Sequence, residues 1–250
     1  MNMIALETSG SYLSFALMRE GSIVNSFHKK VGLAHEVIFW REFPKRFKAS
    51  GLLWEDLDYV AVTRGPGRFT GVRFALALAN AWSRLYGIPL FAPSVIDLMA
   101  WRRNQRELSY SVIASTAKQS HQGILYEIAT APPVAGPRND RRCCLVAYSG
   151  AWVGAIGSKK IEAFGGLDDY VAKVLRADKA KTRKTEVLYW AEDSRIPDIA
   201  KVFAAHKDTI DLKFFTPNAR DLLAFAQSAK AAQFFSDSIA KPIYLKESWK

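Results

Sequence analysis

Short apolar runs separated by turn-forming residues predict three consecutive strands at the start of the chain. Apolar residues recur through Met3–Thr8, Tyr12–Arg19 and Ile23–His28. Residues 9–11 and 21–22 are serine and glycine, which predicts tight turns between these strands. Because the connections are so short, we expect the three strands to form an antiparallel meander.

The hydrophobic spacing changes after the meander, where apolar residues recur at every third or fourth position. Gly51 and Gly87 are placed to end the first two helices, and Thr70 and Ser94 are the expected N-caps of the second and third. The predicted helices are Ala34–Ser50, Thr70–Tyr86 and Ser94–Trp101, and the strands between them are Tyr59–Thr63 and Ile88–Ala92. Three strands followed by alternating helix and strand are the order of a ribonuclease-H-like lobe in an α/β fold.

The second half of the chain repeats this order less regularly. We therefore predict two lobes, residues 1–101 and 102–250, with a cleft between them. The predicted strands are Leu145–Tyr148, Ala151–Ile156, Lys160–Ala163 and Val187–Trp190, with a short terminal strand at Ile243–Leu245. The predicted helices are Leu167–Ala177, Pro197–Ala205 and Ala219–Phe235.

Residues 111–144 break the alternation of strand and helix patterns with paired prolines and a charged run. They are predicted to be an insertion. Two interpretations of this segment stay open. It is either a basic arm that touches RNA or a passively tolerated surface insertion.

Composition narrows the class of protein. Hydrophobic residues make up 49% of the 250 residues, which is enough for a sizeable core. Neither a leader pattern nor an apolar run long enough to span a bilayer is visible, so we expect a cytoplasmic protein. The two cysteines, Cys143 and Cys144, are adjacent and unsuited to a structural disulfide. A formal charge of +11 suits an anionic partner such as RNA or an acidic protein, although a basic surface without a partner is the alternative.

The turn Arg64–Arg73, with the sequence RGPGRFTGVR, follows a predicted strand and starts a helix. Glycines at such a place let the backbone approach other groups closely, and the start of a helix offers free N–H groups that can hold an anion. The alternative is a tight structural turn anchored by a buried Phe69. The spacing matches neither a Walker loop nor a dinucleotide-binding fingerprint. The candidate anion-binding residues are Gly65, Pro66, Gly67, Thr70, Gly71 and Arg73.

Three stretches together resemble the TsaB family, also called YeaZ. They are MIALETSGSYLSFAL at Met3–Leu17, the run Asp56–Leu90 that contains GPGRFTG and ends in GIPL, and PIYLKESWK at the end of the chain. The resemblance covers most of residues 1–100 and about the last ten residues. It implies a two-lobed fold of the actin, sugar-kinase and Hsp70 superfamily.

The resemblance also implies a function and partners. The chain would be a non-catalytic scaffold subunit in the bacterial synthesis of N6-threonylcarbamoyladenosine at position 37 of tRNAs that read codons starting with A. A TsaD-like subunit would carry out the transfer, a TsaE-like ATPase would join the complex, and tRNA would bind through the complex. We expect no activity from the chain alone and no cofactor in it, while the assembled complex uses ATP and Mg²⁺.

On this resemblance, the helices Ala34–Ser50 and Thr70–Tyr86 would pair with the TsaD-like subunit or with a second copy of the chain. Small and large apolar residues alternate on the second helix, which fits close helix packing, and internal core is an equally good explanation of the same pattern. The candidate interface residues are His35, Ile38, Val72, Leu76, Ala79 and Asn80. The chain departs from the family where Glu7 replaces the usual aspartate of the first strand.

Two other functions stay open. A small-molecule kinase or ATPase of the same superfamily needs a carboxylate for Mg²⁺ or for proton transfer, and Glu7 and Glu36 are the candidates. An RNA-binding protein is permitted by the charge, although no known aromatic and basic RNA motif is visible. The four histidines lack the spacing of a metalloprotease, and no metal site is predicted.

Overall fold

The computed structural model describes residues 1–103, 143–148, 151–156, 162–164, 166–177, 184–191, 195–228, 231–236 and 239–243. Most of the predicted insertion at 111–144 lies outside the described residues. Its last two residues, Cys143 and Cys144, belong to a strand instead. None of the helices in the described part of the chain combines the length and the apolar composition that a bilayer span requires.

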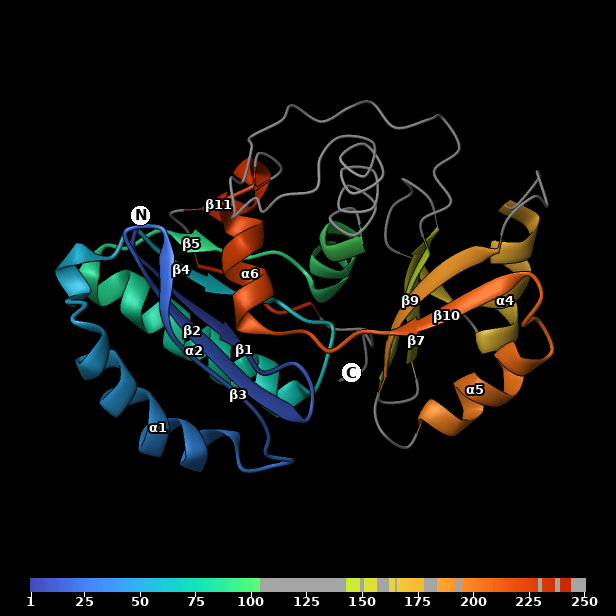
Figure 1. Cartoon of the computed structure of the whole chain (residues 1–250), viewed down its shortest axis with the longest axis horizontal. Coiled ribbons are helices and arrows are strands. Elements are labelled where there is room, and N and C mark those ends of the chain that lie inside the picture. Colours follow the sequence, from blue (N-terminus) through green and yellow to red (C-terminus); the bar gives the residue numbers. More distant parts are fainter. Residues whose placement is uncertain are drawn as a thin grey trace, which may run out of the picture.

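The first sheet has six strands in the order β11-β5-β4-β1-β2-β3 (Figure 1). The pairs β1–β2 and β2–β3 are antiparallel and form the predicted meander, whereas β4 and β5 continue the sheet in parallel from β1. This is the predicted ribonuclease-H-like order. The strands are β1 (Met3–Glu7), β2 (Tyr12–Arg19), β3 (Ser22–Lys30), β4 (Tyr59–Val62), β5 (Leu90–Phe91) and β11 (Phe235–Ser236).

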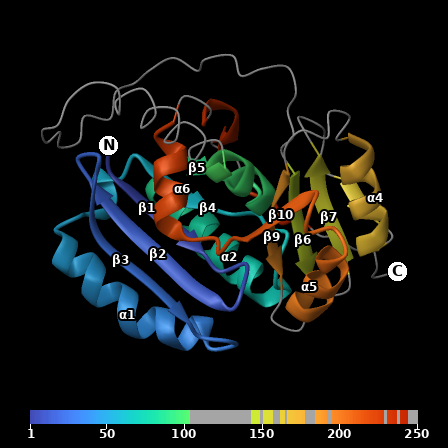
Figure 2. The ribbon, with the colours of Figure 1, turned by 45° about the vertical axis from the view of Figure 1, so that its right-hand side comes forward.

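Two helices, α1 (His35–Ser50) and α2 (Phe69–Tyr86), cover one face of this sheet, and α6 (Ala219–Ala226) covers the other together with the helical residues 95–103 (Figure 2). Gly51 and Gly87 end α1 and α2 in the left-handed conformation, as predicted. Rings from the sheet and both helices pack between them, among them Phe15, Phe39, Phe43 and Trp82.

The second sheet repeats the pattern with five strands in the order β10-β9-β6-β7-β8. A meander of β6, β7 and β8 is again followed by parallel strands, with α4 and α5 on the side away from the first lobe (Figure 1). The elements are β6 (Cys143–Tyr148), β7 (Ala151–Ile156), β8 (Glu162–Phe164), α4 (Leu167–Ala177), β9 (Thr185–Ala191), α5 (Ile196–Ala204) and β10 (Ile210–Phe214).

The strand β9 joins the two lobes, because its side chains alternate between two cores. Val187 and Tyr189 point into the core of the second lobe. Leu188 and Trp190 point the other way and pack with the first lobe, in the same cluster as Met3. The lobes therefore share a continuous apolar core at this seam.

The chain returns to the first lobe after β10, so the predicted division at residues 101 and 102 does not describe the molecule. α6 packs on the first sheet, and β11 adds a strand to its edge beside β5. The physical reason is that the apolar side of α6 covers Phe91 and the other apolar residues on this face of the first sheet. The described residues of the second lobe therefore fall within 143–214.

Two predicted elements differ from the observed ones. The expected helix Ala219–Phe235 ends at Ala226 and is followed by a short 3-10 turn, η3 (Ala232–Phe234), and then by β11. The strand β10 was not predicted. Asn218 caps α6, since its side chain accepts a hydrogen bond from the backbone N–H of Asp221 at 2.9 Å.

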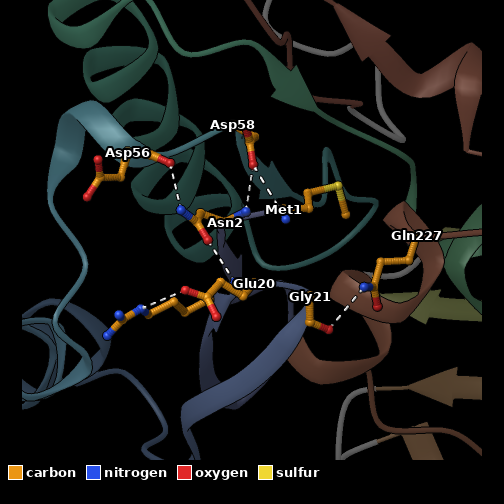
Figure 3. A network of polar contacts seen from close by, with 8 residues as sticks. Met1, Asn2, Glu20, Gly21, Asp56, Asp58 and Gln227 are labelled. Carbon is orange, nitrogen blue, oxygen red and sulfur yellow. Dashed lines mark hydrogen bonds and ion pairs between the residues drawn. The ribbon is translucent and has the colours of Figure 1, made fainter.

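A polar network closes the end of the first sheet where the chain starts (Figure 3). The backbone N–H of Asn2 donates to the carboxylate of Asp58 at 2.6 Å, and its side-chain carbonyl accepts from the N–H of Glu20 at 2.8 Å. The amide of Gln227 donates to the carbonyl of Gly21 at 3.2 Å. This network ties β1, the β2–β3 turn and the end of α6 together.

Candidate functional site

The turn Arg64–Arg73 lies directly on the turn between β1 and β2. The backbone N–H of Arg68 donates to the carbonyl of Ser9 at 2.7 Å, and the hydroxyl of Thr8 donates to the carbonyl of Gly71 at 2.7 Å. A Cβ atom at Gly67 would stand 2.5 Å from the carbonyl oxygen of Ser9, which is closer than real Cβ atoms come. The glycines are therefore required for contact between two segments of this chain.

The predicted anion-binding residues separate into two groups. Gly65, Pro66 and Gly71 are buried and Gly67 is half-buried, whereas Thr70 and Arg73 are exposed near the start of α2. Thr70 is not the N-cap, because α2 begins at Phe69 and its capping position, Arg68, makes no side-chain cap. Anion binding at this turn stays a prediction.

Phe69, the predicted buried anchor, is 46% exposed. The guanidinium of Arg73 lies over its ring, 3.8 Å from the centroid. The turn is therefore anchored by its backbone contacts with Thr8 and Ser9, and Phe69 contributes to the surface.

Glu7, the carboxylate of the first strand, is buried at the end of β1. One of its oxygens accepts two hydrogen bonds, from the backbone N–H of Ser9 and from the hydroxyl of Thr63, both at 2.9 Å. Burial raises the pKa of Glu7, and the hydrogen bonds from Ser9 and Thr63 oppose that shift. Glu7 thus holds the β1–β2 turn against the end of β4.

The second lobe covers the same turn from its own side. Trp190 of β9 is buried, and a Cβ atom built on Gly10 would stand 2.9 Å from Cζ2 of its indole ring. The β1–β2 turn is therefore enclosed between the Arg64–Arg73 turn and a side chain from the other lobe.

The last described residues form a strap along α2. The side-chain amide of Asn80 donates to the carbonyl of Ala240 at 3.0 Å and accepts from its N–H at 2.9 Å. The N–H of Ile243 donates to the carbonyl of Arg64 at 2.7 Å. Asn80, a predicted interface residue, is therefore engaged within the chain.

Comparison with known proteins agrees with these features. A family model described as TsaD, tRNA N6-adenosine threonylcarbamoyltransferase, matches residues 27–118. The tRNA threonylcarbamoyladenosine biosynthesis protein TsaB of Buchnera aphidicola subsp. Schizaphis graminum is 27% identical over 108 residues, 42% of this chain and 51% of that protein. Its counterpart in Escherichia coli (strain K12) is 29% identical over 107 residues, 42% of this chain and 46% of that protein. The chain spans about half the length of these curated relatives.

A solved structure entitled YeaZ from Pseudomonas aeruginosa shares the fold over the whole length, with a TM-score of 0.62, 18% identity, and coverage of 98% of this chain and 99% of that one. The chain is similar to TsaB proteins over about two fifths of its sequence and shares the fold of the YeaZ structure. The two sheets confirm the predicted two-lobed α/β architecture, which this YeaZ structure shares.

Most of the predicted partner-interface residues of this chain are not on its surface. Val72, Leu76 and Ala79 lie in the core between α2 and the first sheet, so the alternative explanation of their pattern, internal core, describes them. Ile38 is half-buried against the same core. A partner could not contact the three α2 side chains without unfolding the lobe.

His35 is also buried, at the first turn of α1. Its Nε2–H donates to the carbonyl of Tyr12, with 3.1 Å between the two atoms. Burial lowers the pKa of His35 below its ordinary value of 6.5, and the nearby Arg68 lowers it further, while the hydrogen bond to Tyr12 acts against both. His35 is therefore a neutral structural donor that fixes the start of α1 on β2.

Four exposed apolar residues that sequence reasoning missed lie on α1, just before it, or on α2. Leu33 is 87% exposed, Val37 70% and Trp40 53%, and on α2 Leu85 is 74% exposed. The spacing of residues 33, 37 and 40 opposite the buried Phe39 was the signal for this surface. Within the described ranges, no three His, Cys, Asp or Glu side chains gather as a metal site would require.

Proposed function

We propose that this chain is a non-catalytic scaffold subunit for the synthesis of N6-threonylcarbamoyladenosine in tRNA, and that it pairs with a TsaD-like catalytic subunit. The names of its relatives support the pathway. On this proposal a TsaE-like ATPase joins the pair, tRNA binds through the complex, and ATP and Mg²⁺ are used by the assembly.

The main support for a non-catalytic role is that the β1–β2 turn is enclosed by other parts of the chain. Glu7, the carboxylate that a kinase of this fold would use, accepts hydrogen bonds from Ser9 and Thr63 and is buried. Backbone from the Arg64–Arg73 turn contacts Ser9, and Trp190 contacts Gly10. A catalytic carboxylate must reach its substrate, and Glu7 is covered by its own chain.

We locate the surface that binds the partner from the apolar side chains that are exposed to solvent. Val37 and Trp40 on α1 are exposed, as is Leu33 just before the helix, and an exposed apolar patch marks an interaction site more often than an isolated residue does. We place the partner on this outer face of the α1–α2 layer, in place of the buried residues first predicted.

Binding of the purified TsaD-like subunit, measured by calorimetry, tests the proposal. The variant Val37→Asp should weaken binding by about tenfold or more, because it places a charge in an apolar contact. Val24→Asp is the matched control, since Val24 is also exposed but lies on β3. Unchanged binding by Val37→Asp, or ATP turnover by the chain alone, would contradict the proposal.

A further inference from the structure

Two aromatic side chains stack at one end of the β2–β3 hairpin. The rings of Tyr12 and His28 are 4.8 Å apart between centroids, and their planes differ by 12°. Tyr12 is opposite Lys30 in the ladder, and the next pair on the same face is Ser14 with His28. Because His28 and Lys30 are exposed and Tyr12 is half-buried, one side of the stack reaches the surface.

Helix α6 begins on the same face of the sheet and brings a cation beside the stack (Figure 1). The backbone N–H of Ala219 donates to the hydroxyl of Ser14 at 2.9 Å, and the next residue, Arg220, is exposed. Arg220 and Gln227 share one side of α6, because they are two helical turns apart. Gln227 donates to the carbonyl of Gly21 in the β2–β3 turn at 3.2 Å. That side of α6 therefore faces the hairpin, with Arg220 at the end where the two rings lie.

The end of the hairpin that carries the rings is basic. Lys29, Lys30 and Arg220 are exposed there. The sequence from Gly21 to His35 contains no aspartate or glutamate, and Glu20 belongs to the turn at the opposite end of the hairpin. An anion that approaches the stack therefore meets cations on both β3 and α6.

One carboxylate, Asp221 of α6, acts on the same end of the hairpin. Burial lowers the pKa of His28, and the charge of Asp221 opposes that shift. The side chain of Asp221 is only 14% exposed, and Nε of Arg102 lies 3.6 Å from one of its oxygens. The amide of Asn218 donates to the other oxygen at 2.7 Å. Asp221 is therefore held within the chain, and its charge is balanced there by Arg102.

We infer that this end of the β2–β3 hairpin, together with the start of α6, is a contact surface for single-stranded RNA. Proteins hold a single strand with aromatic rings on which bases stack and with cations along its backbone. A base stacks on the exposed side of the Tyr12–His28 pair, and Lys30 and Arg220 contact the neighbouring phosphates. These residues come from β2, β3 and α6, so they form no linear RNA motif. The inference rests on the proposed function only for the identity of the RNA as tRNA.

RNA fits this surface better than an added protein strand does. β3 is an edge strand of the first sheet, and an extended peptide can pair with such an edge. Lysines on an edge strand hinder that pairing, and Lys29 and Lys30 are both exposed on β3. Protection of the edge explains the lysines alone, but it does not explain a stacked pair of rings at the surface. Base stacking requires such rings.

Binding of a fluorescent single-stranded RNA to the purified chain at low salt tests the stacking. His28→Ala should weaken binding about tenfold, whereas His28→Phe, which keeps a ring, should bind within about threefold of the wild type. Phe214→Ala is the matched control, since Phe214 is also an exposed aromatic residue but lies on β10. The inference is wrong if the wild type binds no RNA, if His28→Ala binds as the wild type does, or if both His28 variants lose binding equally.

The salt dependence of the same binding tests the phosphate contacts. Lys30→Gln with Arg220→Gln should reduce the slope of log affinity against log salt by about 1.4, because each phosphate contact of a single strand contributes about 0.7. Lys201→Gln with Lys207→Gln is the matched control on exposed residues of the second lobe and should leave the slope unchanged. An equal change in both pairs would indicate a diffuse basic surface and overturn the inference.

A double-stranded form of the same RNA separates stacking from charge. It should bind at least about tenfold more weakly than the single strand, because its bases are already paired and stacked on one another. Equal binding of the two forms would mean that the chain recognises the phosphates alone, which contradicts a stacking surface.

Failure of the proposed function gives a different result. In that case the TsaD-like subunit does not bind the chain, while RNA binding by the chain still depends on His28 and on the cations beside it. If His28→Ala leaves RNA binding unchanged and the TsaD-like subunit still binds, the inference fails and the proposed function stands.

Discussion

A methyl group at Gly71 would overlap the backbone carbonyl of Thr8. We expect Gly71→Ala to lower the free energy of unfolding by more than about 2 kcal/mol, because backbone atoms on both sides must move apart. Urea denaturation followed by circular dichroism measures the change. Gly166→Ala is the matched control, since a Cβ atom there meets no atom of the described residues within 4 Å and should change stability by about 0.5 kcal/mol or less. Equal effects of the two variants would show that the turn contact has been misjudged.

His35 should make the stability of the chain depend on pH. Burial holds the pKa of His35 in the folded chain below 6.5, so between that lowered pKa and 6.5 the unfolded chain binds more protons than the folded chain. Stability from this group is therefore complete above pH 6.5 and is lost as the pH falls through that window. Denaturation of the wild type and of His35→Gln between pH 5 and 8 measures it. A slope in this range that is the same in both proteins would contradict the assignment.

At the residue scale, the sequence predicted which positions matter better than it predicted what they do. Gly67 and Gly71 were singled out as places of close approach, and the structure shows a close approach to the chain itself. Val72 and Leu76 were candidates for a partner surface and lie in the core. Hydrophobic spacing shows that a helix has an apolar side, but a sequence does not show whether a sheet or a partner covers it.

The strap formed by residues 239–243 should depend on Asn80. Removing the amide by Asn80→Ala leaves the N–H and the carbonyl of Ala240 without their partner, which costs about 1–2 kcal/mol. Hydrogen exchange measured by mass spectrometry should then rise in residues 239–243 and in the turn at Arg64, which accepts from Ile243. Asn25→Ala is the control, because the side-chain carbonyl of Asn25 accepts from Arg46 of α1 and not from residues 239–243. If exchange rises in neither segment, the hydrogen bonds of Asn80 do not hold residues 239–243 on α2.

At the element scale, local patterns predicted the first half of the chain and missed part of the second. The meander, α1 and α2 follow from strong alternation and helical spacing bounded by glycines. The helix predicted to run to Phe235 ends at Ala226, because the following residues turn to place β11 beside β5. That pairing joins segments more than a hundred residues apart, so a local sequence pattern cannot predict it.

Trp190 should hold the two lobes together. Trp190→Ala removes a buried ring from the seam, where it contacts Gly10, and we expect a loss of about 3–5 kcal/mol. Trp40→Ala is the matched control, because Trp40 is half-exposed on α1 and should affect partner binding instead of stability. Thermal denaturation separates the two. A stable Trp190→Ala variant would show that the seam is not a shared core.

At the scale of the whole molecule, the two-lobed fold was predicted and the division of the chain between the lobes was not. The resemblance and the repeated strand order predicted two similar lobes, which the two sheets confirm. The return of α6 and β11 to the first lobe depends on which sheet face lacks apolar cover, and only the assembled structure shows that. The enclosure of the β1–β2 turn could not be predicted from the sequence either. It depends on Trp190, which belongs to the other lobe and contacts Gly10 only in the folded chain.

The amount of threonylcarbamoyladenosine in tRNA from cells depleted of this chain tests the central claim most directly. Mass spectrometry of the nucleosides should show loss of the modification, restored by the wild-type chain and by the control Val24→Asp but not by Val37→Asp. Unchanged modification in the depleted cells would contradict the account.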